Sequence, residues 1–137
     1  TPRRPPPFPD KTTARGVHPL PSAFRASPAG DLTGFIRDGY RLNHPLRIEP
    51  GVSFPAFATT SDPAVIIETI KPAESGDGVV VRMYESLGRA TTTTLRTTAA
   101  HRRATVTDLL ERPQHPADLD HLELGPFEIL TIHPATR

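Results

Sequence analysis

Proline sets the strongest limit on what this chain can fold into. Five of its 17 prolines fall within the first nine residues, and Pro19, Pro21 and Pro28 follow. Proline lacks a backbone N–H and holds φ at about −65°, so it is excluded from helix interiors and from central strands. The first third of the chain is therefore predicted to be an extended arm that contains an edge strand at most.

A short helix is predicted over residues 31–43. Asp31 can cap its N-terminus. The apolar side chains that follow at near-helical spacing are Leu32, Phe35, Ile36 and Tyr40. Glycines at positions 34 and 39 weaken the helix, so one or two turns are expected.

After Pro50 the pattern becomes that of β-strands. The segment 65–70 is short, rich in β-branched residues and bounded by prolines, as a buried strand is. Gly76-Asp77-Gly78 follows, and these residues tolerate the positive φ of a tight turn. A hairpin with a returning strand at residues 79–87 is therefore predicted. The remaining predicted strands cover residues 90–98, 103–107 and 122–132.

The last predicted strand is interrupted at Gly125-Pro126. Leu122 and Leu124 share one face before this step, and Phe127 and Ile129 share a face after it, so a bulge that shifts the inward-facing phase is predicted. Strands that recur every 8–12 residues or so, with turns between them, indicate an antiparallel sandwich. The predicted fold class is all-β: an antiparallel β-sandwich with a proline-rich extended N-terminal arm and one short helix.

Composition limits the classes of function. A length of 137 residues fits one domain with a modest core. A net charge of +1 gives no reason to expect a nucleic acid or a membrane surface as partner. The lack of cysteine excludes disulfides and thiolate metal sites, and no apolar run approaches the ~20 residues that span a bilayer. A soluble protein is expected.

The side chains that carry chemistry are scattered along the chain. The acidic residues considered for catalysis are Asp108, Glu111, Asp118, Asp120, Glu123 and Glu128. None stands in the context of a catalytic acid or nucleophile, so exposed carboxylates at strand ends are predicted. The histidines lack metal-ligand spacing, and Asp118-Leu119-Asp120-His121, the nearest approach to a ligand cluster, is predicted to be a solvated loop. The residues alone indicate a non-catalytic β-domain.

Four stretches of the chain carry a family pattern. They are Arg4-Pro5-Pro6-Pro7-Phe8-Pro9-Asp10 with Arg15-Gly16-Val17-His18, then Gly39-Tyr40-Arg41-Leu42-Asn43-His44-Pro45-Leu46-Arg47, then Val65-Ile66-Ile67-Glu68-Thr69-Ile70-Lys71 with Gly76-Asp77-Gly78-Val79-Val80-Val81-Arg82-Met83-Tyr84-Glu85, and finally Thr107-Asp108-Leu109-Leu110-Glu111 with Leu124-Gly125-Pro126-Phe127-Glu128-Ile129. Together, and in this order, they resemble the closing part of glycoside hydrolase family 38 α-mannosidases of the bacterial and fungal type.

This resemblance implies an extended arm and linker from a preceding mannosidase domain over residues 1–45, and a C-terminal β-sandwich domain over residues 46–137. It implies a parent enzyme that hydrolyses terminal α-mannosides with retention. The nucleophile and the zinc ligands of that parent lie in its catalytic domain, and their motifs do not occur here. No catalytic residue, metal ligand or cofactor is therefore expected in this chain, which is predicted to be inactive alone.

The resemblance offers one substrate-binding residue, Arg15, and only in the full enzyme. The Asp-Arg-Gly loop of the family lies near the sugar site, where its arginine can face the pocket. In this chain Ala14 stands in place of the aspartate. Pro19, Pro21 and Ser22 stand where the family has a regular strand.

Three functions follow as hypotheses. The first is an accessory domain or fragment that packs against the catalytic portion of an α-mannosidase and stabilises it. The second is a free-standing carbohydrate-binding or protein-interaction β-domain with mannosides as ligands, and the third is a decayed gene product. The first hypothesis predicts an apolar face, partly on residues 1–28, that the missing domains would cover. A cytoplasmic, bacterial location is expected.

Overall fold

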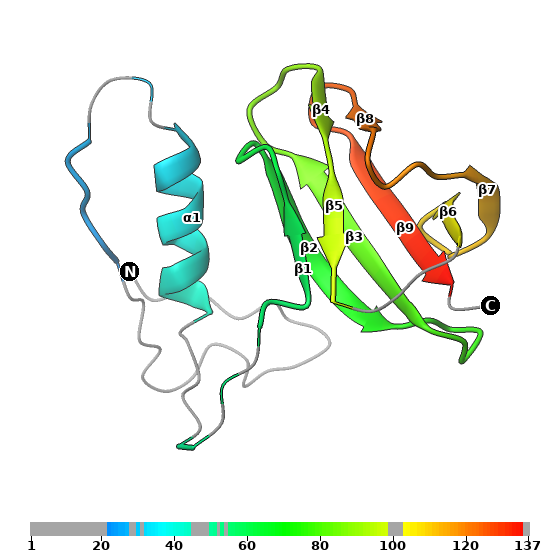
Figure 1. Cartoon of the computed structure of the whole chain (residues 1–137). Coiled ribbons are helices and arrows are strands. Elements are labelled where there is room, and N and C mark those ends of the chain that lie inside the picture. The colour runs from blue at the N-terminus through cyan, green and yellow to red at the C-terminus, as the bar shows by residue number, and fades with distance from the viewer. Residues whose placement is uncertain are drawn as a thin grey trace, which may run out of the picture.

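The computed structural model of the chain describes residues 22–27, 30, 32–44, 50, 51, 53, 55–98 and 103–135. These parts contain a helix and a set of short strands (Figure 1). In chain order the elements are α1 (Leu32–Asn43), β1 (Ala58–Thr60), β2 (Val65–Pro72), β3 (Val79–Glu85), β4 (Thr91–Thr93), β5 (Leu95–Thr97), β6 (Arg103–Thr107), β7 (Pro113–Pro116), β8 (Leu122–Leu124) and β9 (Ile129–Ala135). Most of the predicted arm lies outside the described residues.

The strands form antiparallel sheets around one core. The largest sheet has the order β2-β3-β9-β6-β7, and two small sheets pair β1 with β5 and β4 with β8. The buried core residues of the large sheet are Val65, Val81, Met83, Ala104, Leu130 and Ile132, and those of the small sheets are Leu95, Leu122 and Leu124. Because side chains of the large sheet and of the two small sheets meet in one core cluster, the predicted all-β sandwich is confirmed.

β3 and β9 lie at the centre of the large sheet. Val81 pairs with Ile132 and Met83 with Leu130, and these four side chains are buried in the core. Successive side chains of a strand point to opposite faces. Tyr84 and its neighbours at alternate positions therefore lie on the face turned away from the core, which we call the outer face.

The predicted hairpin between β2 and β3 is confirmed. In its turn Gly76 and Gly78 have φ angles of 77° and 78°, which favour glycine. A Cβ at Gly78 would lie 3.3 Å from the carbonyl oxygen of Pro134, a tight contact that a side chain could have only if the Pro134 backbone shifted slightly. The register shifts between Ile67 and Thr69, which places Glu68 in a β-bulge.

Glu85 is a fully buried carboxylate that joins two turns. Its Oε2 accepts hydrogen bonds from the backbone N–H groups of Gly88, Arg89 and Phe127 at 2.7, 3.2 and 3.1 Å, and its Oε1 accepts one from Leu87 at 2.9 Å. Burial alone raises the pKa of Glu85, but the four hydrogen bonds outweigh burial and hold this pKa below its usual range. Glu85 thus fixes the turn after β3 to the turn before β9.

The predicted inward face after Gly125-Pro126 is wrong. Phe127 is 69% exposed and Ile129 is 55% exposed, whereas Leu130 and Ile132 are buried. The cause is a turn rather than a bulge: the Phe127 N–H bonds to Glu85, and Phe127 has a φ of 57°. β8 therefore ends before this turn, and β9 continues in a different sheet.

Other elements also differ from their predictions. α1 has 12 residues, or about three turns, in spite of its two glycines. Residues 90–98 form two strands, β4 and β5, which pair with different partners. β1 and β7 were not predicted. β7 begins and ends with a proline and lies at the edge of the large sheet, where a missing N–H is tolerated.

Candidate functional site

The acidic residues that were considered for catalysis have structural roles. Arg15, the predicted substrate contact, lies outside the described residues. Asp108 accepts hydrogen bonds from the backbone N–H groups of Leu110 and Arg112, both at 2.9 Å. The backbone N–H of Gly125 donates to Glu128 at 2.6 Å. These carboxylates hold turns, and no acid–nucleophile pair is formed among them.

The candidate ligand cluster at residues 118–121 is an exposed loop. Asp118 accepts a hydrogen bond from the Asp120 N–H at 2.9 Å, and Asp120 pairs with Arg96 at 3.2 Å. His121 contacts Glu123 at 3.1 Å. In the described part of the chain, no group of three or more His, Cys, Asp or Glu side chains could hold a metal ion. No described helix is long and apolar enough to cross a membrane.

An ion pair fastens the turn after β6 to the outer face. Lys71 Nζ lies 2.5 Å from Glu111 Oε1 and 2.8 Å from Glu74 Oε1, and the Glu74 N–H donates to Glu111 Oε2 at 2.7 Å. The hydrogen bond to Glu111 raises the pKa of Lys71, and the same bond lowers the pKa of Glu111. Through this ion pair, the turn after β6 is held against one end of the outer face.

Tyr40 ties α1 to the other end of the outer face. Its hydroxyl donates to the carboxylate of Glu68, the bulge residue of β2, and lies 3.2 Å from the Tyr84 hydroxyl. Burial raises the pKa of Tyr40 above its usual range, and the bonds to Glu68 and Tyr84 raise it further. α1 contains no fully buried residue. We call this Tyr40–Glu68–Tyr84 contact the helix latch.

Replacing Tyr40 with phenylalanine should loosen α1 without unfolding the sandwich. The variant loses both hydrogen bonds of the latch, so the free energy of unfolding of the sandwich should fall by no more than about 1 kcal/mol. Amide hydrogen exchange in residues 32–43 should accelerate clearly, while β3 and β9 keep their protection. Equal protection of α1 in both proteins would show that the latch does not hold the helix.

The side of α1 away from the sandwich carries an apolar hollow. Figure 1 shows residues 22–27 beside α1, on the side opposite the sheets. Arg25 pairs with Asp38 at 2.6 Å, and its guanidinium lies 5.7 Å from the ring centre of Phe35. The hollow between this segment and α1 has a volume of about 630 Å³. Its apolar side chains are exposed: 95% for Phe24, 45% for Phe35 and 37% for Leu42.

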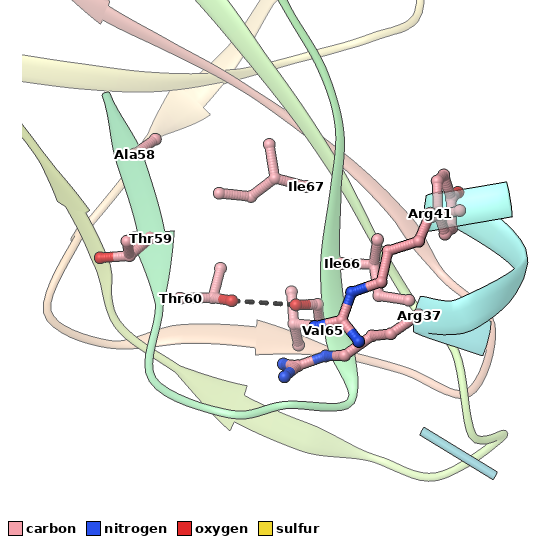
Figure 2. A pocket seen from close by; sticks show the side chains of 9 residues that line it. Arg37, Arg41, Ala58, Thr59, Thr60, Val65, Ile66 and Ile67 are labelled. Atoms are coloured by element: carbon pink, nitrogen blue, oxygen red, sulfur yellow. Dashed lines mark hydrogen bonds between the residues drawn. The ribbon is translucent and has the colours of Figure 1, made fainter. Parts of the chain in front are cut away.

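A second hollow, of about 450 Å³, lies between α1 and the consecutive strands β1 and β2. Its lining residues are Arg37, Tyr40, Arg41, Ala58, Thr59, Thr60, Val65, Ile66 and Ile67. Figure 2 shows the side chains of Arg37 and Arg41 extending from α1 toward Thr60 and Val65. The Thr60 hydroxyl donates to the Val65 carbonyl at 2.9 Å. None of the lining residues is acidic, so this arginine hollow carries net positive charge.

A groove of about 390 Å³ lies on the outer face beside the helix latch. Its lining includes Glu68, Arg82, Tyr84, Phe127 and Ile129. Arg82 donates to Thr131 Oγ1 at 3.2 Å and to the Leu109 carbonyl at 3.1 Å. Since the polar side chains of the groove already bind one another or neighbouring residues, the sugar-binding alternative gains no support here.

The described residues thus form no catalytic constellation. Comparison with known proteins shows the family of the chain. Residues 64–132 match the model of the glycosyl hydrolases family 38 C-terminal beta sandwich domain. The chain belongs to this family. The matched span starts just before β2 and ends within β9, so it contains β2 to β8 and the first part of β9, whereas β1 lies outside it.

Curated relatives extend the similarity beyond the matched domain. The chain is 34% identical to human alpha-mannosidase 2C1 over 145 aligned residues, which cover 94% of this chain, and 31% identical to the mouse protein over the same length. It is 37% identical to alpha-mannosidase G of Dictyostelium discoideum over 98 residues. The chain spans only 14% of the length of the human and mouse proteins. The bacterial and fungal subtype stays a prediction.

Sequence reasoning missed the two hollows on α1. The signal for the arginine hollow was present, because Arg37 and Arg41 are four residues apart and share a face of any helix that includes both. The helix latch had a weaker signal. Tyr40 lies 28 residues from Glu68 and 44 residues from Tyr84, and no local pattern links such distant positions.

Proposed function

We propose that this chain is the C-terminal accessory domain of an α-mannosidase. It is inactive alone and binds the catalytic portion of the enzyme, which it stabilises. That portion hydrolyses terminal α-mannosides with retention and holds the zinc ion. Residues 1–45 act as an extended arm and linker, residues 46–137 act as the sandwich domain, and Arg15 approaches the substrate in the full enzyme. Membership of the family and similarity to named α-mannosidases support this proposal.

The observation that carries the docking role is the apolar hollow on α1. Phe24, Phe35 and Leu42 expose large apolar surfaces around it, and exposed apolar clusters of this kind mark protein–protein contacts. The Arg25–Asp38 pair and the Arg25–Phe35 contact hold the two sides of the hollow together. A partner surface that covers the hollow would bury these side chains without rearranging the sandwich.

The purified chain should not hydrolyse a chromogenic α-mannoside, with or without added zinc. The reaction needs two suitably placed carboxylates. The six carboxylates considered for catalysis hold turns or pair with basic side chains. The measurement is release of the chromophore, with a complete α-mannosidase as the positive control. Zinc-dependent turnover by the chain would show that its catalytic residues have been misplaced.

The chain should bind and stabilise the catalytic portion of its α-mannosidase, produced without this C-terminal region. A partner that binds only the folded state raises its stability by about 2.7 kcal/mol at a concentration of 100 Kd. The midpoint of thermal unfolding of the catalytic portion should therefore rise as the chain is added. Titration calorimetry gives the Kd, and an unchanged midpoint at high concentration would contradict the accessory role.

A matched pair of variants locates the docking surface. Phe35→Ser removes an apolar side chain of the hollow that is 45% exposed. Ile70→Ser removes one on β2 that is 43% exposed and lies outside the hollow. Phe35→Ser should weaken binding about tenfold or more, whereas Ile70→Ser should leave the Kd within about twofold. Equal effects would place the contact elsewhere.

A further inference from the structure

We infer that the arginine hollow binds acidic side chains of the catalytic portion of the α-mannosidase. This inference rests on the proposed function and adds the chemistry of the partner surface. Arg37 and Arg41 are separated by one helical turn and line the same hollow. Figure 2 shows that both side chains reach toward Thr60 on β1 and Val65 on β2 rather than away from the molecule.

The two guanidinium groups lack a matching number of carboxylates nearby. Arg41 pairs with Asp38 at 3.1 Å, but Asp38 also pairs with Arg25 at 2.6 Å. Arg37 has no ion-pair partner among the residues that the structure describes, and no acidic side chain lines the hollow. Like charges at a spacing of four residues destabilise a helix. An anion between Arg37 and Arg41 would remove this repulsion.

The hollow has the chemistry of a carboxylate site. Guanidinium groups bind carboxylates through two parallel hydrogen bonds, which are stronger than bonds between neutral groups. A volume of about 450 Å³ admits one or two Asp or Glu side chains.

The arginine hollow and the apolar hollow lie on different sides of α1, and Arg41 lines both. Protein interfaces commonly have an apolar centre and a polar rim, and arginine is enriched in them. We expect the partner to contact both hollows, with apolar side chains against Phe24, Phe35 and Leu42 and carboxylates against Arg37 and Arg41.

Charge substitution tests the inference. Arg37→Glu should weaken binding of the catalytic portion about tenfold or more, because a carboxylate of the partner would then face a carboxylate. Arg103→Glu, on β6 and outside both hollows, makes the same change of charge on another exposed side chain. This control should change the Kd by no more than about twofold. Calorimetric titrations of both variants at low and high salt provide the comparison.

Salt dependence separates this inference from the proposed function. Binding of the wild type should weaken as salt rises from about 50 to about 300 mM, and Arg37→Glu should flatten that dependence. If Phe35→Ser weakens binding but Arg37→Glu does not, the accessory role stands and the carboxylate site is wrong. If the wild type does not bind, the accessory role and the carboxylate site both fail.

A small anion is the remaining occupant to be tested. Titration of the isolated chain with inorganic phosphate should give no heat below millimolar concentration, because the proposed site is completed by the partner protein. Tight binding of phosphate that Arg37→Glu abolishes would assign the hollow to a small ligand and would overturn the inference.

Discussion

Replacing Glu85 with alanine should abolish most of the stability of the sandwich. The substitution leaves four backbone N–H groups without the carboxylate that they donate to, in a site with no solvent exposure of Glu85. The four hydrogen bonds are part-buried, and each contributes about 1 kcal/mol, so a loss of about 4 kcal/mol in the free energy of unfolding is expected. Urea unfolding followed by circular dichroism measures it.

Two further variants sharpen the Glu85 prediction. Glu85→Gln keeps the shape of the side chain but offers an NH₂ group to backbone donors, so a smaller loss, about 1.5–3 kcal/mol, is expected. Glu123→Ala removes an exposed carboxylate that contacts only His121 in the described structure, and it should change stability by less than about 0.5 kcal/mol. Equal losses in Glu85→Ala and Glu123→Ala would contradict the role given to the buried carboxylate.

The same carboxylate predicts how stability depends on pH. The pKa of Glu85 is lower in the folded protein than in the unfolded chain, where it is about 4.3. The unfolded chain therefore binds the proton first as pH falls. The contribution of Glu85 is complete above that pKa and is lost as pH falls through the lower folded value. Glu85→Gln should show a shallower loss of stability below about pH 4 than the wild type.

The second large effect is expected at Ile132. Its side chain has no solvent exposure and pairs with Val81 in the centre of the large sheet. Ile132→Ala should lower the free energy of unfolding by about 2–5 kcal/mol, through the lost burial and the cavity left behind. Ile129→Ala, on the same strand but 55% exposed, should cost less than about 1 kcal/mol.

The comparison of Ile132 with Ile129 tests the orientation of β9 directly. A larger loss at Ile129 would mean that the inward phase predicted from Phe127 and Ile129 is correct after all. Denaturant unfolding of both variants, with equal m-values, gives the answer.

Local signals in the sequence predicted the parts of the fold that depend on local chemistry. The β2–β3 hairpin follows from turn glycines between two β-branched strands, and it forms at the predicted place. The direction of Phe127 could not be predicted in this way. It depends on a hydrogen bond to Glu85, which lies 42 residues earlier in the chain. The local sequence around a buried glutamate that joins distant turns does not differ from the sequence around an exposed glutamate.

The candidate functional surface also has features that the sequence predicted and features that it did not predict. The composition of the chain and the absence of catalytic motifs predicted a domain without its own active site, and the family match agrees with the C-terminal assignment. The two hollows depend on how α1 lies against the sandwich. That position depends on the contact of Tyr40 with Glu68 and Tyr84, and no local sequence pattern links these three residues.

The short edge strand β7 has a consequence for how this protein can assemble. An open sheet edge offers unpaired N–H and C=O groups to any other strand, which is the usual start of fibrous aggregation. Pro113 and Pro116 remove donors at both ends of β7, so that edge offers few N–H groups to a strand of a second chain. Association at this edge would therefore depend mainly on side-chain packing, which needs a complementary surface on the partner.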